Sequence, residues 1–153
     1  TEENWQARQY EAGETNEMTD FDHIVKIVSL YQQRLKKLSE IAPLFDFFFK
    51  KELVFDSDLL RWKQMTDPEI KDSLESLEKT MGKVKEEDWQ KENLEAVLLP
   101  EAEKTGDRGK LLWPMRVALC GKESSAGPFE IASVLGRDKT ISRIRAARKM
   151  VSK

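Results

Sequence analysis

Residues 66–82 read TDPEIKDSLESLEKTMG, and this stretch contains both the start and the stop signals of a helix. Thr66 or Asp67 can cap it, because a side-chain oxygen there accepts hydrogen bonds from the free N–H groups of the first turn. Pro68 falls in that turn, where its missing N–H group costs nothing, and Gly82 follows the last apolar position. The stretch therefore predicts a helix that begins near Thr66 and ends at Gly82.

Helical patterns continue on both sides of this stretch. Upstream, apolar residues recur at steps of three and four, which places them on one helical face: Phe21, Ile24, Val25, Val28, Tyr31, Leu35 and Leu38. Further helices are expected over about 39–50, 57–65, 88–106, 109–119, 128–135 and 138–151. Pro100 should kink or end the helix that contains it. Strand signals are weak throughout, with no alternating apolar run between hairpin turns, so we expect an all-α fold.

The chain changes composition near residues 50–58, which we interpret as a boundary between two small helical subdomains. Residues 1–18 are rich in Glu, Gln and Asn and lack periodicity, so we expect a flexible acidic leader. Residues 19–50 then form part of a first helical subdomain, and residues 51–153 form a second.

Composition limits the class of protein. Of the 153 residues, 39% are hydrophobic, which is enough for a globular interior, and no stretch approaches the ~20 apolar residues of a membrane span. The single cysteine, Cys120, cannot form an internal disulfide, so a reducing cytoplasm is expected. The net charge is −2, yet residues 104–153 hold 12 Lys and Arg against 4 Asp and Glu. Such a basic end is typical of a nucleic-acid contact surface, although an ordinary solvated basic helix gives the same pattern.

Residues that carry catalysis or bind metals are scarce. His23 is the single histidine and Cys120 has no plausible base nearby in the sequence, so neither a zinc site nor a thiol nucleophile is expected. No glycine-rich phosphate loop is present. We expect no catalytic residue, metal ligand or cofactor site in this chain.

Two segments carry a family resemblance. Residues 109–147, GKLLWPMRVALCGKESSAGPFEIASVLGRDKTISRIRAA, resemble the C-terminal signature of bacterial-type glutamyl-tRNA synthetases. Residues 32–49, QQRLKKLSEIAPLFDFFF, are similar to a second segment of that family, in the same order. The chain departs from the pattern at Cys120, where the family usually has Thr, and at Ala126, where it often has Pro.

The resemblance implies an all-helical anticodon-binding region. It assigns Arg34, which follows Gln33 on the polar side of its helix, to the third anticodon base and to the rejection of glutamine tRNA. A planar guanidinium suits this role because it can pair with two acceptors of a splayed base. Arg116 is also expected to face the anticodon. The turn before the next helix is expected to contact the other bases: Ser125, Ala126, Gly127 and Pro128.

The last helix is expected to hold the RNA backbone. Its predicted buried stripe contains Ile141, Ile144, Ala147 and Val151. This leaves four basic residues in solvent, where they can meet phosphates: Arg143, Arg145, Arg148 and Lys149.

The resemblance also implies the partner, glutamate tRNA, and a parent enzyme that attaches glutamate to it with ATP and Mg²⁺. We expect a monomer with no membrane partner. Two alternatives remain open from the residues alone. One is a non-catalytic helical module that binds RNA or protein without choosing an anticodon, and the other is a structural scaffold that docks partners on its apolar helix faces.

Overall fold

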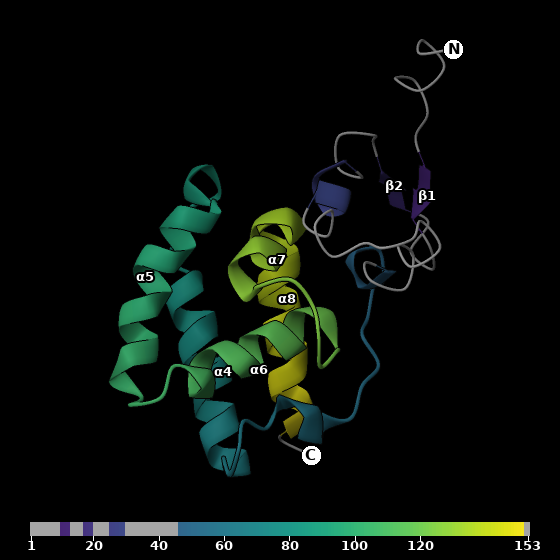
Figure 1. Cartoon of the computed structure of the whole chain (residues 1–153). Helices are drawn as coiled ribbons and strands as arrows, with labels where there is room; N and C mark the ends of the chain where they lie inside the picture. The colour runs from purple at the N-terminus through teal and green to yellow at the C-terminus, as the bar shows by residue number, and fades with distance from the viewer. Residues whose placement is uncertain (1–9, 13–16, 20–24, 30–45, 152–153) are drawn as a thin grey trace, which may run out of the picture. The chain divides into compact units, whose positions relative to one another are not determined.

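A computed structural model of the chain describes residues 10–12, 17–19, 25–29 and 46–151 (Figure 1). The chain divides into two compact units, Thr1–Leu53 and Val54–Lys153. Within the first unit, residues 25–29 are helical and Asp46–Phe48 form a 3-10 turn, η3. Phe47 and Phe48 of that turn are buried, with their ring centres 4.2 Å apart. The rest of the two helices expected over residues 19–50 lies outside the described residues.

A short antiparallel pair of strands was not expected from the sequence. Strand β1, Tyr10–Ala12, pairs with β2, Glu17–Thr19, in a register that places Tyr10 opposite Thr19. The all-α class is confirmed, because every element described in the second unit is a helix or a 3-10 turn.

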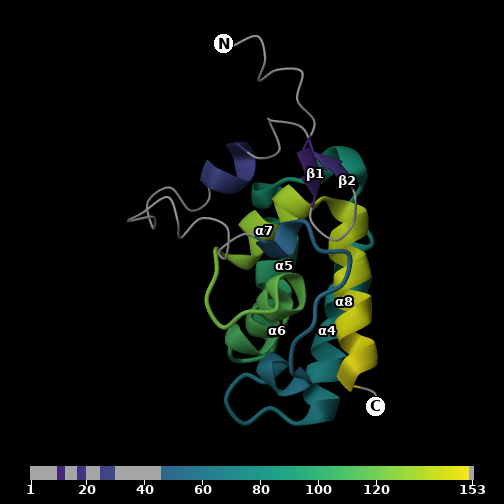
Figure 2. The same cartoon turned by 90° about the vertical axis from the view of Figure 1, so that its right-hand side faces the viewer.

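The second unit is built from five α-helices and two 3-10 turns within the described residues. Its elements in chain order are η4 (Ser57–Leu60), α4 (Asp67–Met81), η5 (Glu86–Asp88), α5 (Lys91–Lys104), α6 (Gly109–Cys120), α7 (Pro128–Leu135) and α8 (Arg137–Val151). Helices α4 and α8 lie side by side, α6 packs across both, and α5 and α7 pack against each other (Figures 1 and 2).

Helix α4 begins and ends as the sequence predicts. Thr66 is the N-cap and forms a capping box with Glu69, in which each side chain bonds to the backbone N–H of the other residue. The hydrogen bond from the Thr66 backbone N–H lowers the pKa of Glu69. The helix ends at Met81, and Gly82 is its C-cap. Its apolar face is completely buried: Ile70, Leu74, Leu77 and Met81.

Two other expected helices differ from the prediction. The segment from Ser57 forms only the turn η4, because the backbone becomes extended at its C-cap, Arg61, and Lys63 then follows with a left-handed φ of 51°. Helix α5 begins at Lys91, later than expected, and continues through Pro100 to Lys104, so the proline does not end it. Leu98 and Ala102, on either side of the proline, are fully buried, so packing holds the last turn in place. None of the helices in the described part of the chain has the length and apolarity to cross a membrane.

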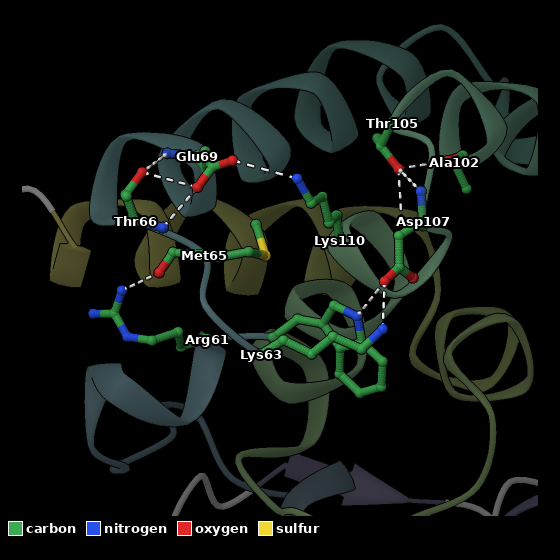
Figure 3. A network of polar contacts seen from close by, with 10 residues as sticks. Arg61, Lys63, Met65, Thr66, Glu69, Ala102, Thr105, Asp107 and Lys110 are labelled. Atoms are coloured by element: carbon green, nitrogen blue, oxygen red, sulfur yellow. Dashed lines mark hydrogen bonds and ion pairs between the residues drawn. The ribbon is translucent and has the colours of Figure 1, made fainter.

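A polar network joins η4, α4 and the start of α6 (Figure 3). Arg61 donates to the backbone oxygen of Met65, and Lys110 bonds to the Glu69 carboxylate at 3.4 Å. Asp107 accepts from Lys63 Nζ at 2.7 Å, from Trp62 Nε1 at 3.1 Å and from the Gly109 N–H at 2.9 Å.

The Asp107 carboxylate is held in its charged form by this network. The hydrogen bonds from Lys63, Trp62 and the Gly109 backbone lower the pKa of Asp107 from 3.8 to about 2. The network therefore ties the loop before α6 to the residues that follow η4.

Candidate nucleic-acid interface

Residues 121–127 connect α6 to α7, and the structure shows why the chain turns here. Helix α6 ends at Cys120, and Gly121 follows with a φ of 67°, a left-handed conformation that favours glycine. The Lys122 N–H donates to the Cys120 sulfur at 3.4 Å, which tightens the turn. Gly127 is the N-cap of α7 and Pro128 is its first residue, so the connection is bounded by two helix ends.

Arg116 holds this connection in shape. Its Nη1 donates to Ser125 Oγ at 2.9 Å and to the Lys122 backbone oxygen at 3.4 Å. Its Nη2 donates to the Glu123 backbone oxygen at 2.6 Å. The structure thus brings Arg116 and Ser125, two of the predicted site residues, into direct contact. Both terminal nitrogens of Arg116 bond to the protein's own loop.

An aromatic pair supports the Arg116 guanidinium. The Arg116 Cζ atom lies 4.6 Å from the centre of the Trp113 ring, within cation–π distance. Trp113 packs on Trp62, with ring centres 5.3 Å apart, and its Nε1 donates to the Leu59 backbone oxygen at 2.8 Å. The connection 121–127 is therefore linked through Arg116 and Trp113 to η4.

The remaining predicted residues of the turn differ in exposure. Ala126 is only 5% exposed, and its backbone oxygen accepts from Ser125 Oγ at 2.8 Å. Gly127 and Pro128 are half-buried. A Cβ atom at Gly127 would lie 2.1 Å from Glu130 Oε2, so this carboxylate lies against the glycine at the start of α7. Glu130 also pairs with Lys91 at 3.2 Å, which raises the pKa of Lys91.

The expectation that Arg143 is exposed to solvent is wrong. Its side chain is buried, with 5% exposure, and Nη1 donates to the Leu119 backbone oxygen at 2.6 Å. Leu119 lies in the last turn of α6, where carbonyl groups have no partner within the helix. Arg143 therefore serves the packing of α6 on α8 and is not available to an RNA backbone. The buried stripe of α8 contains Thr140, Arg143, Ile144 and Ala147, whereas Ile141 and Val151 are half-buried.

The other three basic residues expected at the RNA backbone have surface positions. Arg145 Nε donates to Glu78 Oε1 on α4 at 2.9 Å, and Arg148 Nη1 lies 3.2 Å from Glu78 Oε2. Lys149 is exposed. The α8 surface thus keeps its basic character, with two of its arginines anchored by one carboxylate.

Arg34 and Gln33, the residues predicted for the third anticodon base, lie outside the described residues, as does His23. Cys120 is buried. In residues 46–151 and the shorter described segments, no group of His, Cys, Asp or Glu side chains is placed to hold a metal ion.

Sequence reasoning missed Trp113 as a member of this site. The available signal was its spacing, because residues three apart on a helix lie on the same face. Trp113 precedes Arg116 by this interval within the predicted helix. The bond from Arg116 to Ser125 had no such signal, because it depends on the path of the turn.

Comparison with known proteins identifies the family of this chain. Residues 5–148 match the family described as anticodon binding domain. The glutamate–tRNA ligase of Clostridium acetobutylicum is 38% identical over 125 residues, which are 78% of this chain and 25% of the relative. That of Clostridium tetani is 37% identical over 130 residues, 82% of this chain and 26% of the relative. The chain thus spans about a quarter of the length of these relatives.

A solved structure shows the same fold. The crystal structure of a glutamate tRNA ligase from Elizabethkingia meningosepticum superposes with a TM-score of 0.71 and 23% identity, covering 89% of this chain and 26% of that chain. At this identity the likeness concerns the fold alone, while the sequence match extends over nearly the whole chain. The chain belongs to the anticodon binding domain family and is an anticodon-binding domain of the glutamate–tRNA ligase type.

Proposed function

We propose that this chain recognises the anticodon of glutamate tRNA as part of a cytoplasmic glutamate–tRNA ligase. In that enzyme, regions outside this chain would attach glutamate to the tRNA with ATP and Mg²⁺. The observation that carries the proposal is the clamp of Arg116 on residues 122–125 in a chain that matches the anticodon binding domain family. A loop that is already held by hydrogen bonds loses little conformational entropy when it binds the bases.

Arg116 acts in this proposal by positioning the loop. Its Nη1 and Nη2 atoms bond to Ser125 Oγ and to two backbone oxygens, so three of the five guanidinium N–H donors are used within the protein. The bases would then be met by the half-buried residues Ser125, Gly127 and Pro128. Ala126 would contribute packing beneath them, since its side chain is buried.

Arg34 and Gln33 would contact the third anticodon base. This part of the proposal rests on the resemblance of residues 32–49 to the family segment. Along α8, Arg145, Arg148 and Lys149 would contact phosphates, whereas Arg143 is removed from that role by its burial.

The proposal is tested by binding of the chain to a glutamate tRNA transcript and to transcripts with one altered anticodon base. We expect each alteration to weaken binding by roughly 1–3 kcal/mol, the range for the loss of one base contact. A general RNA-binding module would bind all transcripts equally. A scaffold for proteins would show no preference for tRNA over an unrelated RNA, and either result would overturn the proposal.

A further inference from the structure

A groove of about 570 Å³ lies between α4 and α8, with basic side chains along both walls. Five basic and two acidic residues line it. The basic residues are Lys79, Lys83, Arg137, Arg145 and Arg148. None of residues 121–128 lines it, and Figure 2 shows the α6–α7 connection away from the side formed by α4 and α8. The groove is therefore separate from the anticodon loop site.

One carboxylate aligns two of these arginines. Glu78 lies between Arg145 and Arg148, at 2.9 Å and 3.2 Å, and its side chain is 18% exposed. Arg145 uses its Nε–H in this pair and its side chain is 53% exposed. Since a guanidinium has five N–H donors, most donors of Arg145 stay available to a ligand.

Arg137 forms a fixed cation at one end of the groove. Its Nε donates to the Val84 backbone oxygen and its Nη2 to the Gly82 backbone oxygen, both at 2.9 Å. These carbonyls follow the C-terminus of α4, where a positive charge is favoured by the helix dipole. The position of this charge is thus set by the backbone of the opposite wall.

Lys79 and Lys83 supply positive charge without an internal role. Lys79 lies in the last turn of α4 and Lys83 just after its end, and both are exposed. Their side chains make no hydrogen bond or ion pair with any residue in the described part of the chain. Two flexible ammonium groups beside anchored guanidiniums leave the groove with an excess of positive charge. Its lining holds five basic side chains against Glu75 and Glu78, and Asp138, which pairs with Arg137 at 3.5 Å, adds one further negative charge.

We infer that this groove binds the phosphodiester backbone of RNA, an inference that rests on the proposed function. Phosphate oxygens are the acceptors that guanidinium and ammonium groups favour, and a groove lined on both sides follows a strand better than a flat patch. The family match favours RNA over an acidic protein segment as the occupant. The contact is independent of sequence, because phosphates carry no base information.

The test compares Lys79→Gln/Lys83→Gln with Lys71→Gln in the 153-residue chain. Lys71 is a matched control, since it is an exposed lysine of α4 that does not line the groove. Binding is measured by fluorescence anisotropy between 50 and 200 mM salt, on a glutamate tRNA transcript and on one with an altered anticodon. Thermal unfolding of each variant checks that the fold is retained.

We expect the double variant to lose affinity for both transcripts by the same factor. Loss of two phosphate contacts should reduce the slope of log affinity against log salt by roughly 1.4–1.8. The inference is overturned if the double variant binds like Lys71→Gln, or if it loses only the matched transcript. It is also overturned if the variant loses binding to a polyglutamate peptide while tRNA binding is unchanged.

The same data separate this inference from the proposed function. If the wild-type chain binds both transcripts equally while the double variant loses affinity for both, the anticodon proposal fails and the groove remains. If the wild-type chain prefers the matched transcript and the double variant equals the control, the groove inference alone fails. Absence of wild-type binding to either transcript contradicts both.

Discussion

The guanidinium of Arg116 lies over the ring of Trp113, with its Cζ atom 4.6 Å from the ring centre. Both residues belong to α6, and Arg116 follows Trp113 by three residues. From this position it donates to Ser125 Oγ and to two backbone oxygens of the connection to α7. Trp113 is itself held by its hydrogen bond to the Leu59 backbone oxygen. The shape of the α6–α7 connection is thus set from η4, more than fifty residues earlier in the chain.

Arg116→Lys should impair the choice of anticodon more than general RNA binding. A lysine keeps the charge, but its single ammonium group cannot bridge Ser125 and two carbonyls in the geometry of a planar fork. We expect the ratio of affinities for matched and altered transcripts to fall several-fold, with little change in salt dependence. Arg108→Lys, at an exposed arginine paired with Glu103, is the control. An unchanged ratio in Arg116→Lys would contradict the positioning role.

Arg143→Met should destabilise the fold. The substitution keeps an unbranched side chain but removes the guanidinium, which leaves the Leu119 carbonyl without its donor and costs about 1–3 kcal/mol for a buried group. Urea unfolding followed by circular dichroism measures this change. Lys149→Gln, at an exposed position on the same helix, should stay within about 0.5 kcal/mol of the wild type. Equal stabilities for the two variants would show that the Arg143 contact is unimportant.

Asp107→Asn should change how the free energy of unfolding depends on pH. The folded-state pKa of Asp107, about 2, lies below its ordinary value of 3.8. The ionised Asp107 therefore stabilises the fold fully when the pH is above the unfolded-state pKa, and this stabilisation is lost as the pH falls from about 4 towards 2. The difference in unfolding free energy between wild type and Asp107→Asn should narrow across this window. A difference that is constant from pH 5 to pH 2 would argue against the network around Asp107.

Thr66→Ala should remove the side-chain cap of α4. Loss of a threonine N-cap typically costs about 1 kcal/mol, because the Glu69 N–H loses its acceptor, and here the bond from the Thr66 hydroxyl to the Glu69 carboxylate is lost as well. Denaturant unfolding should show this loss, while Ser73→Ala in the interior of the same helix should not destabilise. If both variants unfold at the wild-type midpoint, the capping box contributes nothing.

Local signals explain how much of the fold was predictable. The sequence predicted the caps of α4, the bounds of α7 and the end of α6 near Gly121. Threonine, proline and glycine start or stop a helix at their own position, so these boundaries have local signals. The early end of η4 was missed because the extended backbone of Arg61 and the left-handed backbone of Lys63 have no local signal in the sequence. Helix α5 passed through Pro100 because tertiary packing outweighed the local rule.

The candidate site was less predictable, since its side chains interact across elements. The helical pattern predicted Arg143 on the basic surface, but its side chain is buried and donates to the Leu119 carbonyl at the end of α6. The family resemblance selected Arg116 and Ser125, yet only the structure shows that they bond to each other. Arg34 and Gln33 stay predictions, because they lie outside the described residues.

The most direct test of anticodon recognition is a binding cycle at the third anticodon base. Wild-type chain and Arg34→Ala are each titrated with a glutamate tRNA transcript and with one changed at that base. We predict that the wild-type chain discriminates between them by roughly 1–3 kcal/mol and that Arg34→Ala binds both alike. Equal discrimination by the wild-type chain and Arg34→Ala, or none by the wild-type chain, would contradict the account.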